Sequence, residues 1–324
     1  MPIEGSQAAT MDLRSLYLQT GADVDLPIVD AHHHFWDIER NNHPWLREIP
    51  RIAFRYGDYG AICRNFLPDE YFRLAAPHRV VRTVYMEGEW DPRDPLGEPR
   101  WVHEIASETG FPSAMAGQVW LDREDVDDVL RGHAAYPLVR SVRHKPKTVP
   151  RRADYRDDFA APASMRCPRW RDGYAKLGRY DLMFELQAPW WHFVEASELA
   201  RDFPATTIIV NHTGLPAHRS DAALTGWRRA LEGLATAPNV HLKISGIGML
   251  GKAWSAEVNG PIVRDAIRIF GVDRCLFASN FPVDSLVATF DQIYSGFKTI
   301  TADLDARDRL QLFHDNAVAL YRLH

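Results

Sequence analysis

Short apolar segments alternate along the chain with longer segments in which apolar residues recur at helical spacing. This alternation predicts that each strand precedes a helix, and it favours a parallel sheet over separate α and β domains. Eight strands are expected, at 26–29, 80–87, 113–121, 138–144, 181–187, 206–212, 240–245 and 274–279. Helices are expected at 68–76, 99–108, 123–134, 168–179, 190–202, 221–236, 260–270 and 286–299, with a last one at 305–322 that closes the bottom of the molecule.

Eight strand–helix units predict an α/β fold of the (β/α)8 TIM-barrel type, in which residues 26–324 form one domain behind an N-terminal extension, residues 1–25. A doubly wound sheet is the alternative, but no Gly-x-Gly-x-x-Gly sequence follows a predicted strand. Two connections are unusually long, 37–67 after the first strand and 145–167 after the fourth. Because barrel active sites lie among the loops at the carboxyl ends of the strands, we expect both loops to shape or cover a site. Both are rich in arginine, and one or two of these arginines could bind a carboxylate.

Histidines stand at the carboxyl end of the first predicted strand. Side chains alternate along a strand, so Asp30, His32 and His34 are expected on one side and His33 on the other. Imidazoles on one face can hold a metal ion or contact a substrate oxygen, and buried polar rings each need a hydrogen-bond partner. Polar residues also end the other strands, which places them at the reactive end of a barrel: Glu87, Arg143, His144, Glu185, Gln187, His212, Lys243, Asn280 and Asp284.

Six short motifs occur in order along the chain. They are Asp30-x-His32-x-His34 with Phe35-Trp36, Val142-Arg143-His144, the segment 211–216, the segment 241–246, Ser279-Asn280-Phe281-Pro282, and Asn316-Ala317 with Leu320-Tyr321. Together they resemble the amidohydrolase superfamily, and within it the amidohydrolase-2 branch of TIM-barrel hydrolases that contains sugar-acid lactonases and pyrone-dicarboxylate lactonase. The resemblance covers nearly the whole chain.

The resemblance implies roles for individual residues. His32 and His34 match a pair that binds metal in metal-dependent relatives, and His212 matches a histidine that touches metal or the substrate carbonyl. Arg143 resembles a residue that binds the carboxylate or carbonyl of the substrate. The eighth-strand position normally holds an aspartate that acts as general base, and here it is Asn280. A neutral amide cannot take a proton from water at neutral pH and is a poor metal ligand.

The missing aspartate leaves the general base open. Asp284 is one candidate, with capping of the following helix as its structural alternative. Glu87, Glu185 and His32 are further candidates. The substrate-binding residues are expected to be Arg143, His144, Glu87, Glu185, Gln187, Lys243 and Trp36.

The asparagine at position 280 also affects the expected cofactor. Without a carboxylate, the ligand set for a metal is three histidines at best, His32, His34 and His212. We therefore expect either no cofactor or a single divalent metal ion, with zinc the first candidate.

The resulting hypothesis is a hydrolase that opens the lactone ring of a sugar acid or of an aromatic-degradation intermediate by attack of water on the ring carbonyl. A metal-dependent decarboxylase ranks lower, because Asp30-Ala31-His32 replaces the Glu-x-His of such enzymes. A lactone isomerase, or a barrel that only binds ligand, is the remaining alternative.

Composition limits the partners. The chain is 46% hydrophobic and 25% charged with a net charge of −5, so no general basic field for nucleic acid is expected. No apolar run is long enough for a membrane span, and residues 1–25 do not resemble a signal peptide. The three cysteines are far apart and are expected to be free thiols in a reducing cytoplasm. The expected partner is a small anionic lactone or carboxylate, and an oligomer of identical chains remains open.

Overall fold

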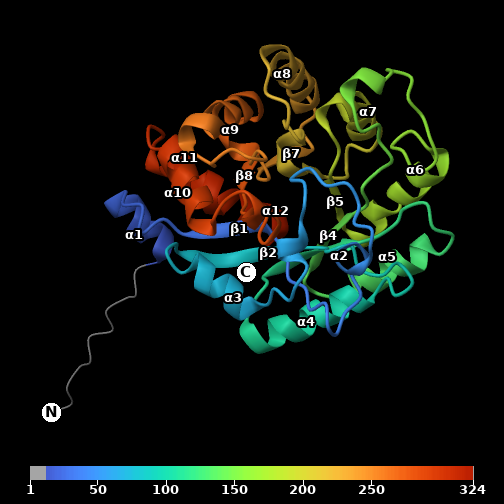
Figure 1. The fold of residues 1–324 in the computed structure, drawn as a ribbon, viewed down its shortest axis with the longest axis horizontal. Helices are drawn as coiled ribbons and strands as arrows, with labels where there is room; N and C mark the ends of the chain where they lie inside the picture. Colours follow the sequence, from blue (N-terminus) through green and yellow to red (C-terminus); the bar gives the residue numbers. More distant parts are fainter. Residues whose placement is uncertain (1–11, 324) are drawn as a thin grey trace.

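The computed structural model describes residues 12–323, and its eight parallel strands pair in chain order. The strands are β1 (Ile28–His33), β2 (Val80–Met86), β3 (Ala114–Gln118), β4 (Val139–Arg143), β5 (Met183–Leu186), β6 (Ile208–Val210), β7 (Val240–Ile244) and β8 (Cys275–Phe277). A parallel bridge between His33 and Phe281 brings the last strand back to the first, and the His34 amide donates to the Phe281 carbonyl at 2.7 Å. The strands lie at the centre of the ribbon with helices around them (Figure 1). The predicted (β/α)8 barrel is confirmed.

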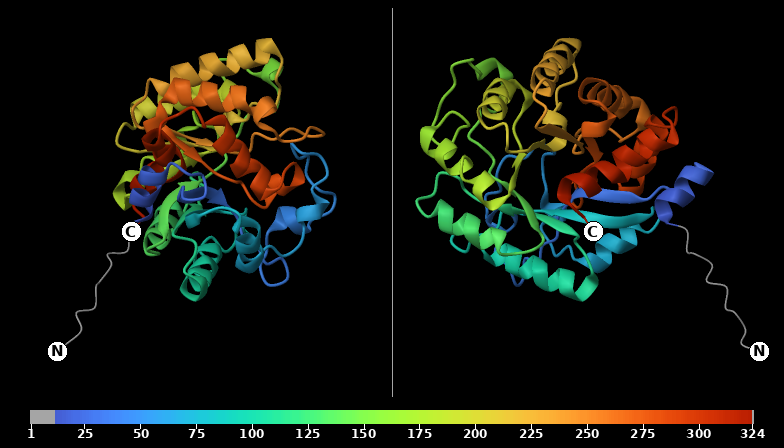
Figure 2. Two further views of the ribbon diagram at one scale, coloured as in Figure 1. Left: turned by 90° about the vertical axis from the view of Figure 1, so that its left-hand side faces the viewer. Right: turned by 180° about the vertical axis from the view of Figure 1, so that it is seen from behind.

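Helices follow the strands as expected, and they cover the outside of the barrel (Figure 2, right). They are α3 (Pro68–Ala75), α4 (Gly97–Thr109), α5 (Val126–Ala134), α6 (Pro168–Tyr174), α7 (Phe193–Asp202), α8 (Asp221–Ala235), α9 (Ala256–Phe270) and α10 (Phe290–Ile300). Short 3-10 helices lie at Gly60–Ile62, Arg152–Asp154, Leu177–Tyr180, Trp190–His192, Asn211–Gly214, Val272–Arg274 and Val283–Leu286.

Some helix boundaries differ from the prediction for local reasons. Helix α9 begins earlier than expected because the Ser255 hydroxyl accepts a hydrogen bond from the Val258 amide. Helix α10 begins later, because Thr289 and Gln292 form a capping box at its start. The helix expected at 305–322 is three pieces, α11 (Ala306–Leu310), a π-helical turn (Gln311–Asp315) and α12 (Asn316–Tyr321). Two helices were not expected, α1 (Leu13–Thr20) and α2 (Pro44–Arg47).

The C-terminal helix closes one end of the barrel, as predicted. Tyr321 and Ala317 of α12 pack in a buried cluster with small and aliphatic side chains from the strands, among them Val29, Ala31 and Ile209. A separate, larger cluster holds the helices against the outside of the sheet. With one end filled by α12, a substrate can approach only from the other end, where the strands terminate.

The first strand is irregular, and the irregularity changes which side chains share a face. The pairing of β1 with β2 shifts register between Asp30 and His33. Asp30 accepts a hydrogen bond from the hydroxyl of Tyr71 on the outer helix α3 at 2.7 Å, and the His33 ring packs 4.7 Å from the ring of the same tyrosine. The prediction that Asp30 shares a side with His32 and His34 is therefore wrong, because an extra residue in a strand resets the alternation.

Both long loops lie where they were expected. An antiparallel bridge between Trp36 and Phe66 joins the two ends of the 37–67 loop. In the side view this loop (blue) projects from the same end of the barrel as the loop around residue 250 (orange) (Figure 2, left). The Leu250 side chain lies beside Gly57. The 37–67 loop and the loop around residue 250 therefore form part of the rim around the open end.

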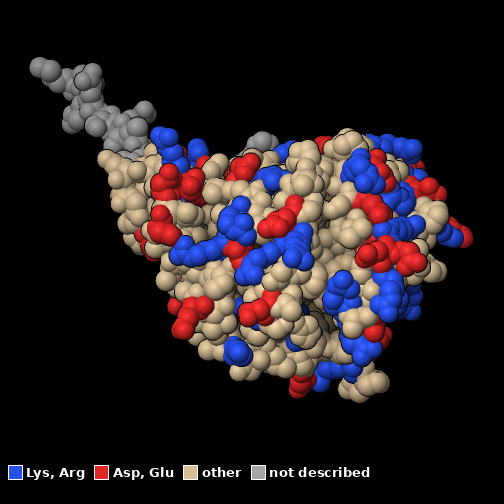
Figure 3. Space-filling view, turned by 90° about the horizontal axis from the view of Figure 1, so that it is seen from above, with Lys and Arg blue, Asp and Glu red and all other residues tan. Residues whose placement is uncertain are grey.

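The surface carries charges of both signs. On the face shown in Figure 3 basic and acidic side chains are interspersed. Many charged side chains of the protein form ion pairs, such as Arg166 with Glu198. None of the helices within residues 12–323 has both the length and the apolar character to cross a membrane. Cys63, Cys167 and Cys275 are unpaired, as predicted.

Candidate active site

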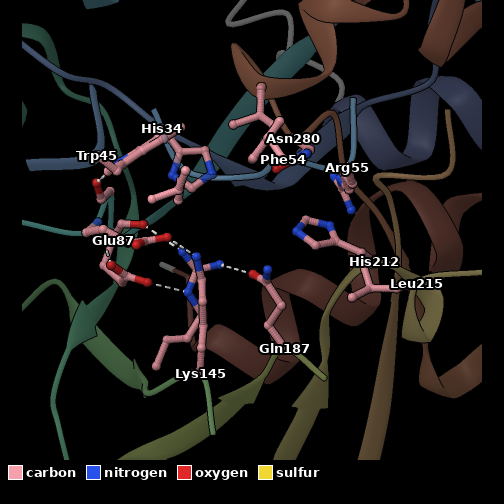
Figure 4. Close-up of a pocket in the computed structure, with 15 residues that line it drawn as sticks. His34, Trp45, Phe54, Arg55, Glu87, Lys145, Gln187, His212, Leu215 and Asn280 are labelled. Atoms are coloured by element: carbon pink, nitrogen blue, oxygen red, sulfur yellow. Dashed lines mark hydrogen bonds and ion pairs between the residues drawn. The ribbon is translucent and has the colours of Figure 1, made fainter. Parts of the chain in front are cut away.

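A cavity of about 260 Å³ opens at the carboxyl ends of the strands. Its lining combines polar side chains from six strand ends and one loop with an apolar rim (Figure 4). The polar lining residues are His34, Arg55, Glu87, Glu89, Arg143, Lys145, Gln187, His212 and Asn280, and the apolar ones are Trp45, Ile52, Phe54, Leu215 and Val283. The predicted site residues His34, Glu87, Arg143, Gln187, His212 and Asn280 are thus brought together.

Three imidazoles meet at the base of this cavity. The His32 ring lies between the other two, with its centroid 5.1 Å from that of His34 and 4.6 Å from that of His212. Both nitrogens of His32 are buried without a hydrogen-bond partner within residues 12–323. His34 and His212 each use Nδ1, toward the Met86 carbonyl at 2.8 Å and the Ser245 hydroxyl at 3.0 Å respectively. Their Nε2 atoms remain available to a ligand.

The surroundings fix the protonation state of these rings. Burial lowers the pKa of His32, His34 and His212 well below its ordinary value, and the positive charge of Arg143 lowers all three further. The rings are therefore neutral at pH 7. Because a carbonyl oxygen can only accept, His34 Nδ1 must carry the proton, which leaves Nε2 with a free lone pair. His34 is thus set as a proton acceptor facing the cavity.

Unusual backbone conformations position two of the side chains. His212 and Asn280 both have positive φ, 54° and 56°, in the left-handed region that non-glycine residues adopt rarely. His212 is the second residue after the end of β6, and Asn280 is the third residue after the end of β8, so each left-handed turn lies at the open end of the barrel. Such conformations cost about 1–3 kcal/mol and concentrate at functional sites.

Arg143 is held by a dense set of acceptors. Its Nε donates to a Glu87 carboxylate oxygen, one Nη donates to the Glu87 carbonyl at 2.8 Å, and the other donates to Gln187 at 3.0 Å. The second Glu87 oxygen accepts from the Glu89 amide at 2.7 Å. Lys145 pairs with Glu89 at the rim. Glu87, one of the predicted candidates for a base, is therefore occupied as the partner of Arg143.

Asp284 lies behind Asn280 and does not line the cavity. One of its oxygens accepts from the Asn280 amide at 2.6 Å, from the Tyr56 hydroxyl at 3.1 Å and from Arg55 at 3.4 Å. Burial raises the pKa of Asp284 to about 6, against the opposing effect of Arg55. The alternative role as a helix cap is wrong, because Thr289 caps α10. Asp284 instead positions Asn280 and Arg55.

Arg55 was not predicted as a site residue. It belongs to the arginine-rich loop 37–67, and that richness was the available signal, but it did not distinguish Arg55 from its neighbours. One Nη of Arg55 is buried without a partner within residues 12–323, although the side chain lines the cavity. This nitrogen, on a guanidinium group whose other Nη pairs with Asp284, is suited to an anionic oxygen.

Four predicted substrate contacts lie elsewhere. Glu185 and Lys243 form a fully buried ion pair at 2.9 Å inside the barrel, where Glu185 also accepts from Tyr321. The His144 Nδ1 accepts from the Leu121 amide and from the Trp170 indole, both at 2.9 Å. Trp36 is buried, with its ring centroid 5.9 Å from that of His34. The signal that suggested them was placement at strand ends, but strand ends also carry residues that point into the barrel or toward the helices.

The donor set around the imidazoles does not fit a metal ion as it stands. Within residues 12–323, no group of three or more His, Cys, Asp or Glu side chains is arranged to hold one. The nearby carboxylates Glu87 and Glu185 are already paired with cations, and the eighth-strand position offers only the Asn280 amide. Arg143 also opposes a further positive charge next to the histidines. The three histidines as zinc ligands stay a prediction.

The fold and the polar site at the open end define the class, a TIM-barrel enzyme whose reactive groups lie at the carboxyl ends of the strands. The family model described as amidohydrolase matches residues 29–323. The chain therefore belongs to the amidohydrolase family, and it is an enzyme of that superfamily.

Individual proteins are similar over the same length. The uncharacterized protein y4mH of Sinorhizobium fredii is 39% identical, covering 92% of this chain and 99% of that protein. An L-fucono-1,5-lactonase of Burkholderia ambifaria is 27% identical, covering 91% and 95%. A crystal structure of an amidohydrolase from Burkholderia multivorans with bound zinc is 24% identical with a TM-score of 0.73, covering 92% and 99%. The last likeness is one of fold.

Proposed function

We propose that this protein is a lactonase, a hydrolase that opens the ring of an anionic lactone by attack of water on the ring carbonyl. The observation that carries the proposal is the pairing of a neutral imidazole acceptor, His34 Nε2, with two arginines that line the same cavity. Hydrolysis of an ester needs a group that takes a proton from water and donors that stabilise the oxyanion that forms. The similarity to L-fucono-1,5-lactonases supports the same reaction.

Each polar residue of the cavity has a separate role in the proposed reaction. Arg143 and Arg55 donate to the carbonyl oxygen and to a substrate carboxylate, since both side chains line the cavity. His34 accepts a proton as the water oxygen bonds to the carbonyl carbon. The ring carbon–oxygen bond then breaks, and the proton passes from His34 to the departing ring oxygen, which gives a hydroxy acid. His212 contacts the water or the carbonyl through Nε2 from the other side.

The other candidate bases are less suited to this step. Glu87 and Glu185 are each paired with a cation, and His32 lies beneath the cavity lining. Asp284 is separated from the cavity by Asn280, to which it is hydrogen-bonded. A positioned base contributes typically about 10²–10⁴-fold to the rate, so its removal is measurable.

The test is incubation with a panel of aldonolactones and pyrone lactones, with products followed by mass spectrometry. A lactonase adds the mass of one water, an isomerase leaves the mass unchanged, and a decarboxylase loses carbon dioxide. His34→Ala is expected to lower kcat by about 10²–10⁴-fold. His103→Ala, which removes a histidine of α4 outside the cavity, is the matched control. Full activity in His34→Ala or His212→Ala would refute the role given to that residue.

A further inference from the structure

A second cavity adjoins the first, and we propose that it receives an apolar substituent of the substrate. The preferred lactone would then carry an aromatic or alkyl group on the carbon that bears the ring oxygen, in place of a chain of hydroxyl groups. This inference rests on the proposed lactone hydrolysis and names its substrate class.

The two cavities are neighbours that share part of their walls. The second has a volume of about 480 Å³, and Arg55 and Leu215 line both. Its remaining walls come from Tyr56, from the segments after β5 and β6, from the segment 246–250 after β7, and from the beginning of the 145–167 loop. A substrate held by Arg55 at the reaction cavity can therefore extend past this side chain into the second space.

Gly246 makes the separation between the cavities thin. It lines the second cavity and has a positive φ of 58°. A Cβ atom at this position would lie 2.6 Å from His212 Nδ1 and 2.8 Å from a nitrogen of Arg55, closer than real Cβ contacts allow. Only glycine lets the backbone pass this near to both side chains. The second cavity thus begins directly beside two groups of the reaction site.

The chemistry of the lining favours an apolar occupant. Trp191, Pro216, Ile247 and Met249 supply most of its character, and among the described residues that line it the only Lys, Arg, Asp or Glu is Arg55 at the junction. The other polar side chains in the lining are Tyr56, Thr148 and His218, and the Tyr56 hydroxyl already donates to Asp284. A polyhydroxylated chain placed here would therefore find few partners for its hydroxyl groups, which costs free energy. An aromatic ring or alkyl chain would instead be removed from water, at a gain that grows with its apolar area.

The walls are fixed by hydrogen bonds. The Trp191 indole donates to the Val149 carbonyl at 3.0 Å, and the Val149 amide donates to His192 Nε2 at 3.0 Å. The other ring nitrogen of His192 is 2.8 Å from the buried Glu195 carboxylate. This chain of contacts holds the 145–167 loop against the start of α7. A cavity formed in advance spends less free energy on ordering when ligand binds.

The experiment compares matched lactones, δ-valerolactone and its derivatives with a pentyl or phenyl group on the carbon that bears the ring oxygen. The substituted lactones are expected to have at least ~10-fold higher kcat/KM through a lower KM, since one or more carbons placed in an apolar pocket change specificity by this much. Ala217→Trp, at an exposed residue that lines the second cavity, is expected to remove the preference and leave δ-valerolactone hydrolysis unchanged. Ala222→Trp, exposed on α8 and outside both cavities, is the control.

Equal kcat/KM for substituted and unsubstituted lactones would overturn the inference and leave lactone hydrolysis standing. An equal effect of Ala217→Trp on the hydrolysis of substituted and unsubstituted lactones would also overturn the inference. If the protein hydrolyses no lactone, binding of 5-phenylvalerate and acetate by calorimetry separates the two ideas. Tighter binding of 5-phenylvalerate that is lost in Ala217→Trp supports the second cavity although the reaction is refuted, and equal binding in both proteins refutes it as well.

Discussion

Within residues 12–323, Arg55 is the one cation that pairs with the buried carboxyl group of Asp284, which makes Asp284→Asn an informative change. The Asp284 side chain is almost fully buried, and burial raises its pKa from 3.8 to about 6. A raised carboxyl pKa means that the folded state binds the proton more tightly than the unfolded chain does. The resulting stabilisation is present at low pH and is lost as the pH rises through about 6. At pH 8 the folded protein therefore carries an unfavourable buried charge.

The size of this cost follows from the shift. A rise of the pKa from 3.8 to about 6 corresponds to about 3 kcal/mol at about 1.36 kcal/mol per pKa unit. The neutral amide introduced by Asp284→Asn avoids that cost while it still accepts from Asn280 and Tyr56, so the variant is expected to be about 3 kcal/mol more stable at pH 8. At pH 5 the wild-type carboxyl is mostly protonated in the folded state, and the advantage falls to about half that.

Urea unfolding of both proteins at pH 5 and pH 8 measures this difference, because the titration of all other groups cancels between them. Asp58→Asn, at a side chain 83% exposed in the 37–67 loop, is the control and should show no such pH dependence. The Asp284→Asn change also removes the anion that holds Arg55, so kcat/KM is expected to fall about 10-fold, equivalent to 1.4 kcal/mol. If Asp284→Asn raised the free energy of unfolding by the same amount at pH 5 and pH 8, the raised pKa of Asp284 would be refuted.

Three further changes test separate parts of the structure. His144→Ala leaves the Leu121 amide and the Trp170 indole without their acceptor, and it is expected to lower the free energy of unfolding by about 1–3 kcal/mol for each of these donors. The kcat is expected to stay unchanged. A lower kcat in a variant that unfolds at the same urea concentration as the wild type would show that His144 acts on the substrate. Lys243→Met leaves Glu185 buried without its cation and is expected to lower the free energy of unfolding in denaturant by about 3–5 kcal/mol. The double variant Lys243→Met, Glu185→Leu should recover most of this loss of stability. No recovery would contradict the view that the unpaired charge of Glu185 causes the loss. Dialysis against EDTA is expected to leave lactone hydrolysis unchanged, since Asn280 offers an amide where a carboxylate ligand would stand; loss of activity that zinc restores would refute this.

The fold could be predicted from the sequence because its signals are local. Each strand is a short apolar run followed by an amphipathic helix, and eight repeats of that unit leave few arrangements other than a barrel. Strand-end placement likewise predicted that His34, Arg143, His212 and Asn280 would meet, because parallel strands end at one face. The prediction of the face on which Asp30 lies was wrong. The register shift within β1 depends on the pairing of β1 with β2 and cannot be read from the sequence of β1 alone.

The sequence by itself determined the barrel, the reactive end and the identity of the imidazoles. Only the tertiary structure decided which polar groups are free to react. Glu87 and Glu185 resemble candidate bases in the sequence, but cations from other strands occupy them. Arg55 resembles its neighbours in a loop, but long-range packing places it beside Asp284, 229 positions away. Charge and hydrogen-bond partners at an active site come from segments far apart in the chain, so their pairing is a property of the fold.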